Sequence, residues 1–199
     1  MTNAMIALTA RTAALAATAF VLALMPTAAS AQSDPAVQYM QRAARDMIAA
    51  SRVRSPAPIA SAINRYGATT AIALGALGNY RPKLTPTDQP TYVAGTVSFM
   101  ARYVAEQAPK YPVSHVEFSP ESRPAKYGLM VDSRVHLKDG SVYDVSWMLL
   151  KAGTTYRVRD AQVMGFWATP LMQTLFENYI TENGGNPKAL VTVLARQMQ

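Results

Sequence analysis

The spacing of the apolar residues changes after Tyr111-Pro112, and this change constrains the fold more than any other feature of the chain. Before it, apolar residues recur at helical spacing. After it, apolar and polar residues alternate on both sides of Asp139-Gly140, a turn dipeptide. Helical spacing returns after Thr169-Pro170. Helices, then antiparallel strands, then helices indicate an α+β fold.

The turn between the two long strands fixes how they pair. A three-residue loop, Lys138–Gly140, pairs Val131 with Trp147 and Arg134 with Asp144, an attractive cross-strand pair. A two-residue loop would set a polar residue opposite Trp147 and mix the two faces. We therefore predict the three-residue loop and one strongly apolar sheet face.

Start and stop signals delimit the predicted helices. A proline at the first helical position, after a residue that can cap, marks five starts: Asp34-Pro35, Ser55-Pro56, Thr85-Pro86, Thr169-Pro170 and Asn186-Pro187. The third helix is expected to begin later, because Pro90 falls in its first turn. Gly67 and Gly184-Gly185 are predicted stops. A β-bulge is expected near Arg159-Asp160, where the parity of the apolar residues changes.

Residues 1–31 resemble a cleaved secretory signal peptide, which leaves residues 32–199 as one domain. The apolar run 12–25 is shorter than the ~20 residues that a spanning helix needs. Small residues at Ala29-Ser30-Ala31 precede a predicted mature N-terminus at Gln32. The chain has no Cys, which excludes a lipid-anchored lipoprotein and disulfides. We expect a periplasmic protein that is soluble after signal cleavage.

Charge and motifs narrow the function further. The formal charge of +7 suits an anionic membrane or acidic proteins, and export argues against nucleic acid as a partner. His115 and His136 lie far apart in sequence without metal-ligand spacing, so each is expected to be an ordinary strand or surface residue. Asp160 is expected to make a structural ion pair or a backbone hydrogen bond. Gly75–Gly78 lacks the phosphate-loop signature. We predict no metal, no cofactor and no enzymatic activity.

Several segments together resemble the MlaC (toluene-tolerance) family over roughly residues 34–196. The run Tyr156–Gly165 is an aromatic-x-Val-x-Asp-apolar-x-Val-x-Gly strand that leads into a helix with Phe176. Leu77–Arg81 is similar to the family's Leu-Gly-x-aromatic-basic turn. The chain departs from the family where it has Met164–Ala168 in place of Glu-Gly-Val-Ser-Leu, and Met172-Gln173 in place of Tyr-Arg.

The resemblance implies helices around a curved, mainly antiparallel sheet that enclose a pocket for phospholipid acyl chains. It implies a carrier that moves phospholipid between an outer-membrane lipoprotein complex and an inner-membrane ABC transporter, and so maintains outer-membrane lipid asymmetry. We predict that the tails contact apolar residues of one sheet face and two helices: Val97, Met100, Tyr103, Val104, Leu129, Val131, Val145, Trp147, Leu149, Val163, Met172, Leu175 and Phe176.

Two other interpretations stay open at this point. The apolar surfaces could close on each other as a plain core, since close packing is the norm, and the chain would then be a binding module without a ligand. A periplasmic enzyme on a similar conical α+β scaffold is the other alternative. It would need acid and base groups that converge in a pocket.

Overall fold

Antiparallel pairing joins all the strands of the computed structural model, which describes residues 34–198. The sheet follows the order β1-β3-β4-β5-β6, and β2 pairs with β3 beside β1. The strands are β1 (Val113–Phe118), β2 (Arg123–Ala125), β3 (Gly128–Leu137), β4 (Val142–Ala152), β5 (Thr155–Val163) and β6 (Phe166–Trp167). The predicted α+β class is therefore confirmed. The predicted leader, residues 1–31, lies outside the described residues.

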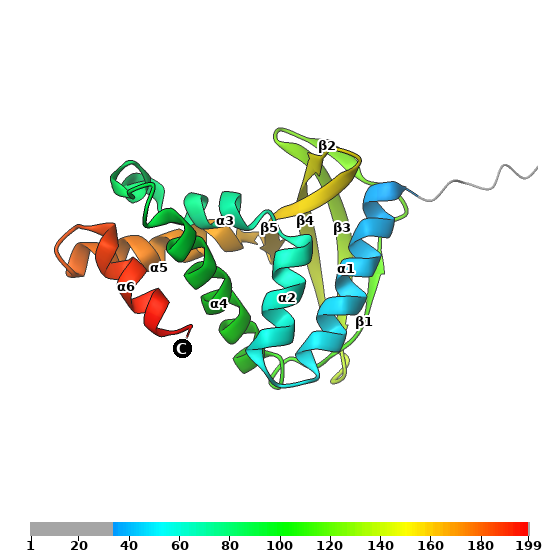
Figure 1. The fold of residues 1–199 in the computed structure, drawn as a ribbon. Coiled ribbons are helices and arrows are strands. Elements are labelled where there is room, and N and C mark those ends of the chain that lie inside the picture. The colour runs from blue at the N-terminus through cyan, green and yellow to red at the C-terminus, as the bar shows by residue number, and fades with distance from the viewer. Residues whose placement is uncertain (1–33, 199) are drawn as a thin grey trace, which may run out of the picture. The chain divides into compact units, whose positions relative to one another are not determined.

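The helices precede and follow the sheet in sequence (Figure 1). They are α1 (Pro35–Ser51), α2 (Pro56–Tyr66), α3 (Thr69–Ala76), the 3-10 helix η1 (Gly78–Lys83), α4 (Gln89–Gln107), α5 (Ala168–Glu182) and α6 (Pro187–Arg196). The starts predicted at Pro35, Pro56 and Pro187 are confirmed, and α4 begins late with Pro90 in its first turn. Between residues 34 and 198, no helix is both long and apolar enough to cross a bilayer.

The predicted register of the β3–β4 hairpin is confirmed. Val131 lies opposite Trp147, and Arg134 lies opposite Asp144. The bulge is confirmed as well: β4 continues without a break while the β5 partner changes from Asp160 to Val158, so that one β5 residue is left over. The extra residue returns the apolar side chains of β5 to one face of the sheet.

Helix α1 covers the apolar face of the sheet. Its N-cap is Asp34, whose Oδ1 accepts hydrogen bonds from the backbone N–H groups of Ala36 and Val37 at 2.7 and 3.3 Å. The other oxygen, Oδ2, accepts from the backbone N–H and the hydroxyl of Ser122 at 2.8 and 2.7 Å. One carboxylate therefore caps the helix and ties it to the loop before β2. The core beneath α1 consists of Ala36, Val37, Tyr39, Met40, Val131 and Leu149.

A second core lies among the helices that are grouped away from β1 and β3 in Figure 1. It is made of apolar side chains from α3, α4, α5 and α6 and from the α3–η1 junction: Ala73, Ala76, Leu77, Tyr92, Met172, Phe176, Ile180, Leu190, Val191 and Leu194. The ring of Phe176 meets those of Tyr92 and Phe99 edge-on. The hydroxyl of Tyr92 donates to the Ala73 carbonyl at 2.8 Å, and burial raises the pKa of this tyrosine.

The start of α5 differs from the prediction. Thr169 was expected to cap the helix, but the helix begins at Ala168 and Thr169 is buried in its first turn. The capping group comes from strand β5 instead, because Asp160 Oδ1 accepts from the Thr169 N–H at 3.0 Å and from the Ala161 N–H at 2.9 Å. The expectation that Asp160 makes a backbone hydrogen bond is confirmed.

Candidate functional site

The structure divides the residues predicted to contact lipid between the two cores. Four of them, Leu129, Val131, Trp147 and Leu149, pack beneath α1. Three others belong to the helical core or pack against it: Met100, Met172 and Phe176. The sheet face and helices α4 and α5 were expected to face each other across a pocket. Here α1 covers that sheet face instead, so tails could reach it only if α1 moved away.

Three predicted positions lie at the surface. Tyr103 and Leu175 are each 59% exposed, and Val163 is 41% exposed. The inward orientation expected for these side chains is not found. Val145, by contrast, is buried within the sheet. Leu175 was expected to point inward because it lies between Met172 and Phe176 on an apolar helix. Periodicity alone does not show which edge of an apolar stripe is exposed to solvent.

Val97 lies in a cleft between α2 and α4 with a volume of about 760 Å³. Its walls are mostly small or apolar side chains, and its lining residues include Ala57, Ala60, Val93, Val97, Ala101 and Met198. Arg102 lines one end and is held there by hydrogen bonds to the backbone carbonyl and side-chain oxygen of Gln197. The cleft falls within the range of about 300–1,000 Å³ that is typical of small-molecule sites.

Tyr103 and Val104 line a second cleft of about 450 Å³, where the end of α4 meets α1 and the start of β1. Met47, Ile48 and Val113 provide further apolar surface. Three exposed cations also line this cleft, namely Arg52, Arg54 and Lys138. No carboxylate lies among the described residues of its wall, so the cleft offers positive charge without internal compensation.

A thin layer of side chains separates the two clefts. Ala50, Ile59 and Ala101 form a small buried cluster, with Met47, Ala60, Ile63, Val104 and Ala105 around it. Ala60 and Ala101 also line the larger cleft, whereas Met47 and Val104 line the smaller one. Members of one small apolar cluster therefore line both clefts.

A polar network fixes one end of α2. The Tyr39 hydroxyl donates to the Tyr66 carbonyl at 2.8 Å, and the Tyr66 hydroxyl donates to Asp46 Oδ2 at 2.6 Å. This last bond raises the pKa of Tyr66 and holds the pKa of Asp46 below its ordinary value. Since Tyr66 closes α2 and Tyr39 lies on α1, the network holds the C-terminal end of α2, while the start of α2 at Pro56 lies at the larger cleft.

The clefts are suited to binding rather than to acid–base chemistry. Within residues 34–198, the walls of both clefts contain neither a carboxylate nor a histidine. What they offer is apolar surface and guanidinium or ammonium groups, which pair with phosphate oxygens. Their chemistry fits an amphiphile with an anionic head.

The family-like runs Leu77–Arg81 and Tyr156–Gly165 do not line the two clefts and make contacts within the fold instead. Gly75 lets the Arg159 guanidinium and Thr169 approach α3, where a Cβ atom would lie 2.6 Å from an Arg159 nitrogen. The Asn79 N–H donates to Glu177 Oε1 at 2.7 Å, so the start of η1 is tied to α5. The departures at Met164 and Phe166 are exposed, in the β5–β6 turn and at the first residue of β6.

Sequence reasoning missed a side-chain cluster at the sheet edge. His115 and His136 were expected to be unrelated, but β1 pairs with β3 so that the two residues lie opposite each other, beside Glu117. The signal was the alternation of polar and apolar residues in His115–Phe118, which marks a strand. Its partner strand could not be identified from the alternation alone.

Comparison with known proteins agrees with this architecture. The family model described as MlaC protein matches residues 36–196. Among solved structures, a phospholipid-binding protein from Ralstonia solanacearum, determined in complex with a phospholipid, superposes with a TM-score of 0.67 at 19% sequence identity. The match covers 83% of this chain and 97% of that one. No curated protein sequence matches the chain. The family match spans most of the chain, so the chain belongs to the MlaC family.

Proposed function

We propose that the chain is a phospholipid carrier whose acyl-chain site is the pair of clefts on either side of the α2–α4 contact. The observation that carries the proposal is the cleft next to Tyr103 and Val104, which combines apolar walls with Arg52, Arg54 and Lys138 and has no opposing carboxylate among its described residues. Family membership and the phospholipid in the Ralstonia protein support the same ligand class.

The energetics suit a carrier that releases its cargo only on contact with a partner. Burying about 14 methylenes of one acyl chain gains roughly 11 kcal/mol before the costs of binding, at ~0.8 kcal/mol each. Spontaneous release would then be slow. We infer that docking to an inner-membrane ABC transporter or to an outer-membrane lipoprotein complex opens the α2–α4 contact, and that the basic surface speeds the encounter.

We infer that the chain is exported and that it does not act as an enzyme. Residues 1–31 would be removed in the periplasm, and intact-mass measurement of periplasmic protein should give an N-terminus at Gln32. A mass that retains the leader would contradict a freely diffusing carrier. The chain would transfer lipid between membranes unchanged, because the cleft walls described here bring together no acid, base and nucleophile.

Lipid mass spectrometry of protein purified from the periplasm tests the ligand. The variant Val93→Glu places a charge on the wall of the larger cleft, and an unpaired charge there is strongly disfavoured beside an acyl chain. The variant Leu175→Glu adds the same charge at an exposed site and is the matched control. We expect much less copurified lipid for Val93→Glu, and wild-type occupancy for Leu175→Glu.

A second pair of variants tests the head-group end. Lys138→Glu reverses a charge at the smaller cleft, and Lys151→Glu reverses a charge on an exposed strand position outside both clefts. We expect only Lys138→Glu to lower the fraction of anionic phospholipid that is bound. If wild-type protein carries no lipid and takes none from phospholipid vesicles in the presence of its transporter, the carrier function is wrong. If lipid is bound equally by all variants, the site is misplaced.

A further inference from the structure

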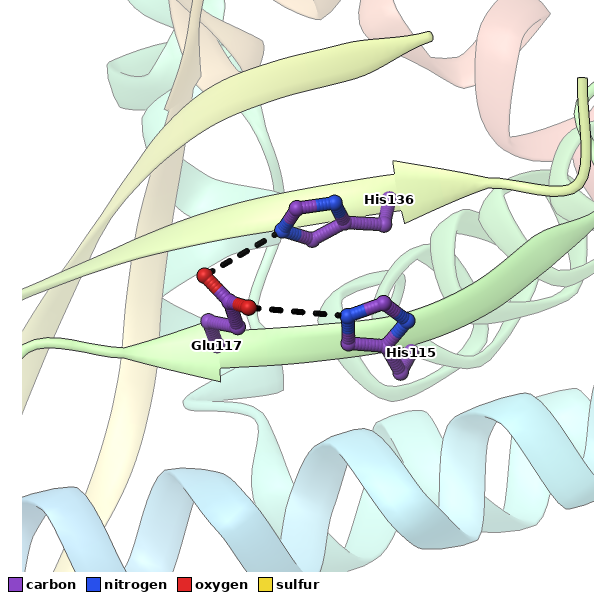
Figure 2. A group of neighbouring side chains, drawn as sticks. All are labelled: His115, Glu117 and His136. Atoms are coloured by element: carbon purple, nitrogen blue, oxygen red, sulfur yellow. Dashed lines mark ion pairs between the residues drawn. The ribbon is translucent and has the colours of Figure 1, made fainter. Parts of the chain in front are cut away.

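The two histidines of the chain lie side by side on the sheet face opposite α1. The β1–β3 register pairs His115 with His136, and their rings stack with centroids 4.3 Å apart and planes 9° from parallel. Glu117 follows two residues after His115 and therefore projects from the same face of β1. Figure 2 shows both imidazoles directed toward its carboxylate.

The spacing of the three side chains matches that of ligands to one ion. Glu117 Oε1 lies 3.6 Å from His115 Nε2, and Glu117 Oε2 lies 3.3 Å from His136 Nε2. One ligand atom from each residue falls within 4.8 Å of the others. A tetrahedral ion with bonds of about 2.0–2.1 Å holds neighbouring ligand atoms about 3.3–3.4 Å apart. The two distances from Glu117 to the histidines are already close to that spacing.

The hydrogen bonding of one buried atom in the cluster is incomplete. His136 Nε2 is buried and makes no hydrogen bond within the described structure, although Glu117 Oε2 is 3.3 Å away. Buried polar nitrogens nearly always have a donor or acceptor, or a metal ion, as a partner. In Figure 2 this nitrogen faces the Glu117 carboxylate.

We propose that His115, Glu117 and His136 bind one divalent transition-metal ion of the zinc class on this face of the sheet. Two imidazole nitrogens and one carboxylate oxygen form a common three-ligand set for zinc and leave a fourth position for water or for a donor from another molecule. The parallel rings must tilt so that both Nε2 lone pairs converge. His115 is free to do so, because 57% of its side chain is exposed.

Neighbouring charged side chains compete with the ion for the Glu117 carboxylate. The Arg134 guanidinium lies 2.8 Å from Glu117 Oε2, which leaves Oε1 free to coordinate. Asp144 lies opposite Arg134 on β4, so a second carboxylate stands beside this arginine in the sheet register. Asp132 does not compete, because it is held by Arg123 and Ser146.

Titration of the full chain with Zn²⁺, in protein purified without a polyhistidine tag, tests the site. We expect one ion per chain by calorimetry and a shift of both imidazole signals in a ¹H–¹⁵N spectrum, which contains no other histidine from this chain. Mg²⁺ should shift neither, because it prefers an all-oxygen shell. Movement of only one imidazole, or of neither, would overturn the proposal.

Substitutions separate this site from adventitious binding at the surface. His115→Ala and Glu117→Gln alter exposed side chains and should each weaken Zn²⁺ binding at least tenfold with the fold intact. Glu121→Gln removes an equal charge at a nearby exposed position and should leave the affinity unchanged. Arg134→Gln frees Glu117 and should strengthen binding several-fold. Equal affinity of wild type, His115→Ala and Glu117→Gln would show that these residues are not the ligands.

Discussion

Helix α1 is joined to the sheet by directed hydrogen bonds and a packed core, whereas α2 meets α4 through small apolar side chains. On the sheet side, Asp34 Oδ2 accepts hydrogen bonds from the backbone N–H and the hydroxyl of Ser122 in the loop before β2. At the α2–α4 contact, Ile59 of α2 and Ala101 of α4 form a buried cluster with Ala50 of α1, and members of this cluster line a cleft on each side. Directed polar bonds favour one arrangement, whereas apolar contacts are not directional. We therefore expect the lipid entrance at α2–α4 and a rigid α1–sheet unit.

The largest expected difference between the two regions is in their response to truncation. Leu149→Ala removes a side chain with 0% exposure from the core beneath α1 and should lower the free energy of unfolding by about 2–5 kcal/mol. Val93→Ala, at the wall of the larger cleft, should cost about 1 kcal/mol or less, because the side chain is only partly buried. Urea denaturation measures both. Equal losses would mean that the cleft wall is packed as tightly as the core.

The next largest effect is expected at the start of helix α5, which Asp160 caps. Asp160→Ala removes the acceptor of the Thr169 and Ala161 N–H groups and should cost about 0.5–2 kcal/mol, as the loss of a helix cap does. Asp160→Asn keeps a carbonyl acceptor and should cost less. Thermal unfolding of both variants checks the order. If Asp160→Asn and Asp160→Ala lower the stability equally, the charge of the carboxylate, and not its role as a cap, explains why Asp160 stabilises the fold.

The tie between α1 and the sheet should depend on pH. Burial opposes ionisation of Asp34, but the hydrogen bonds from Ser122, Ala36 and Val37 prevail and lower its pKa. A depressed pKa contributes stability that is present above the unfolded value, about 3.9, and is lost as the pH falls through the lower folded value. Asp34→Ala should therefore cost about 0.5–2 kcal/mol near neutral pH. The deficit should shrink below about pH 4. A deficit that is constant with pH would contradict this account.

The sequence predicted the elements better than their partners. Alternation and the Lys138–Gly140 loop determine the β3–β4 register because a one-residue slip would expose the whole apolar face. No such local rule states which helix covers that face. Helix α1 and helix α4 both offer apolar stripes, and the choice between them depends on long-range contacts such as Asp34–Ser122. The predicted lipid-contact set was therefore drawn from two separate cores.

The candidate sites were also predictable to different degrees, because some depend on local spacing and others on long-range contacts. Val97, Tyr103 and Val104 were identified because they share a broad apolar helix, and they do line clefts. The cations at the smaller cleft come from the α1–α2 loop and the β3–β4 turn, which are far apart in sequence. The histidine pair depends on the β1–β3 register and on a bulge after Val113, neither of which has a clear local signal.

The smallest expected effect concerns the outer stripe of α5. Leu175 lies between two core residues in sequence, yet 59% of it is exposed, so Leu175→Ser should change the free energy of unfolding by no more than about 0.5 kcal/mol. Met172→Ala, one turn earlier and buried, should cost about 2–5 kcal/mol and is the matched comparison on the same helix. Urea denaturation distinguishes the two. A loss of more than about 1 kcal/mol for Leu175→Ser would mean that this side chain is buried in solution, as the spacing of apolar residues along the helix predicts.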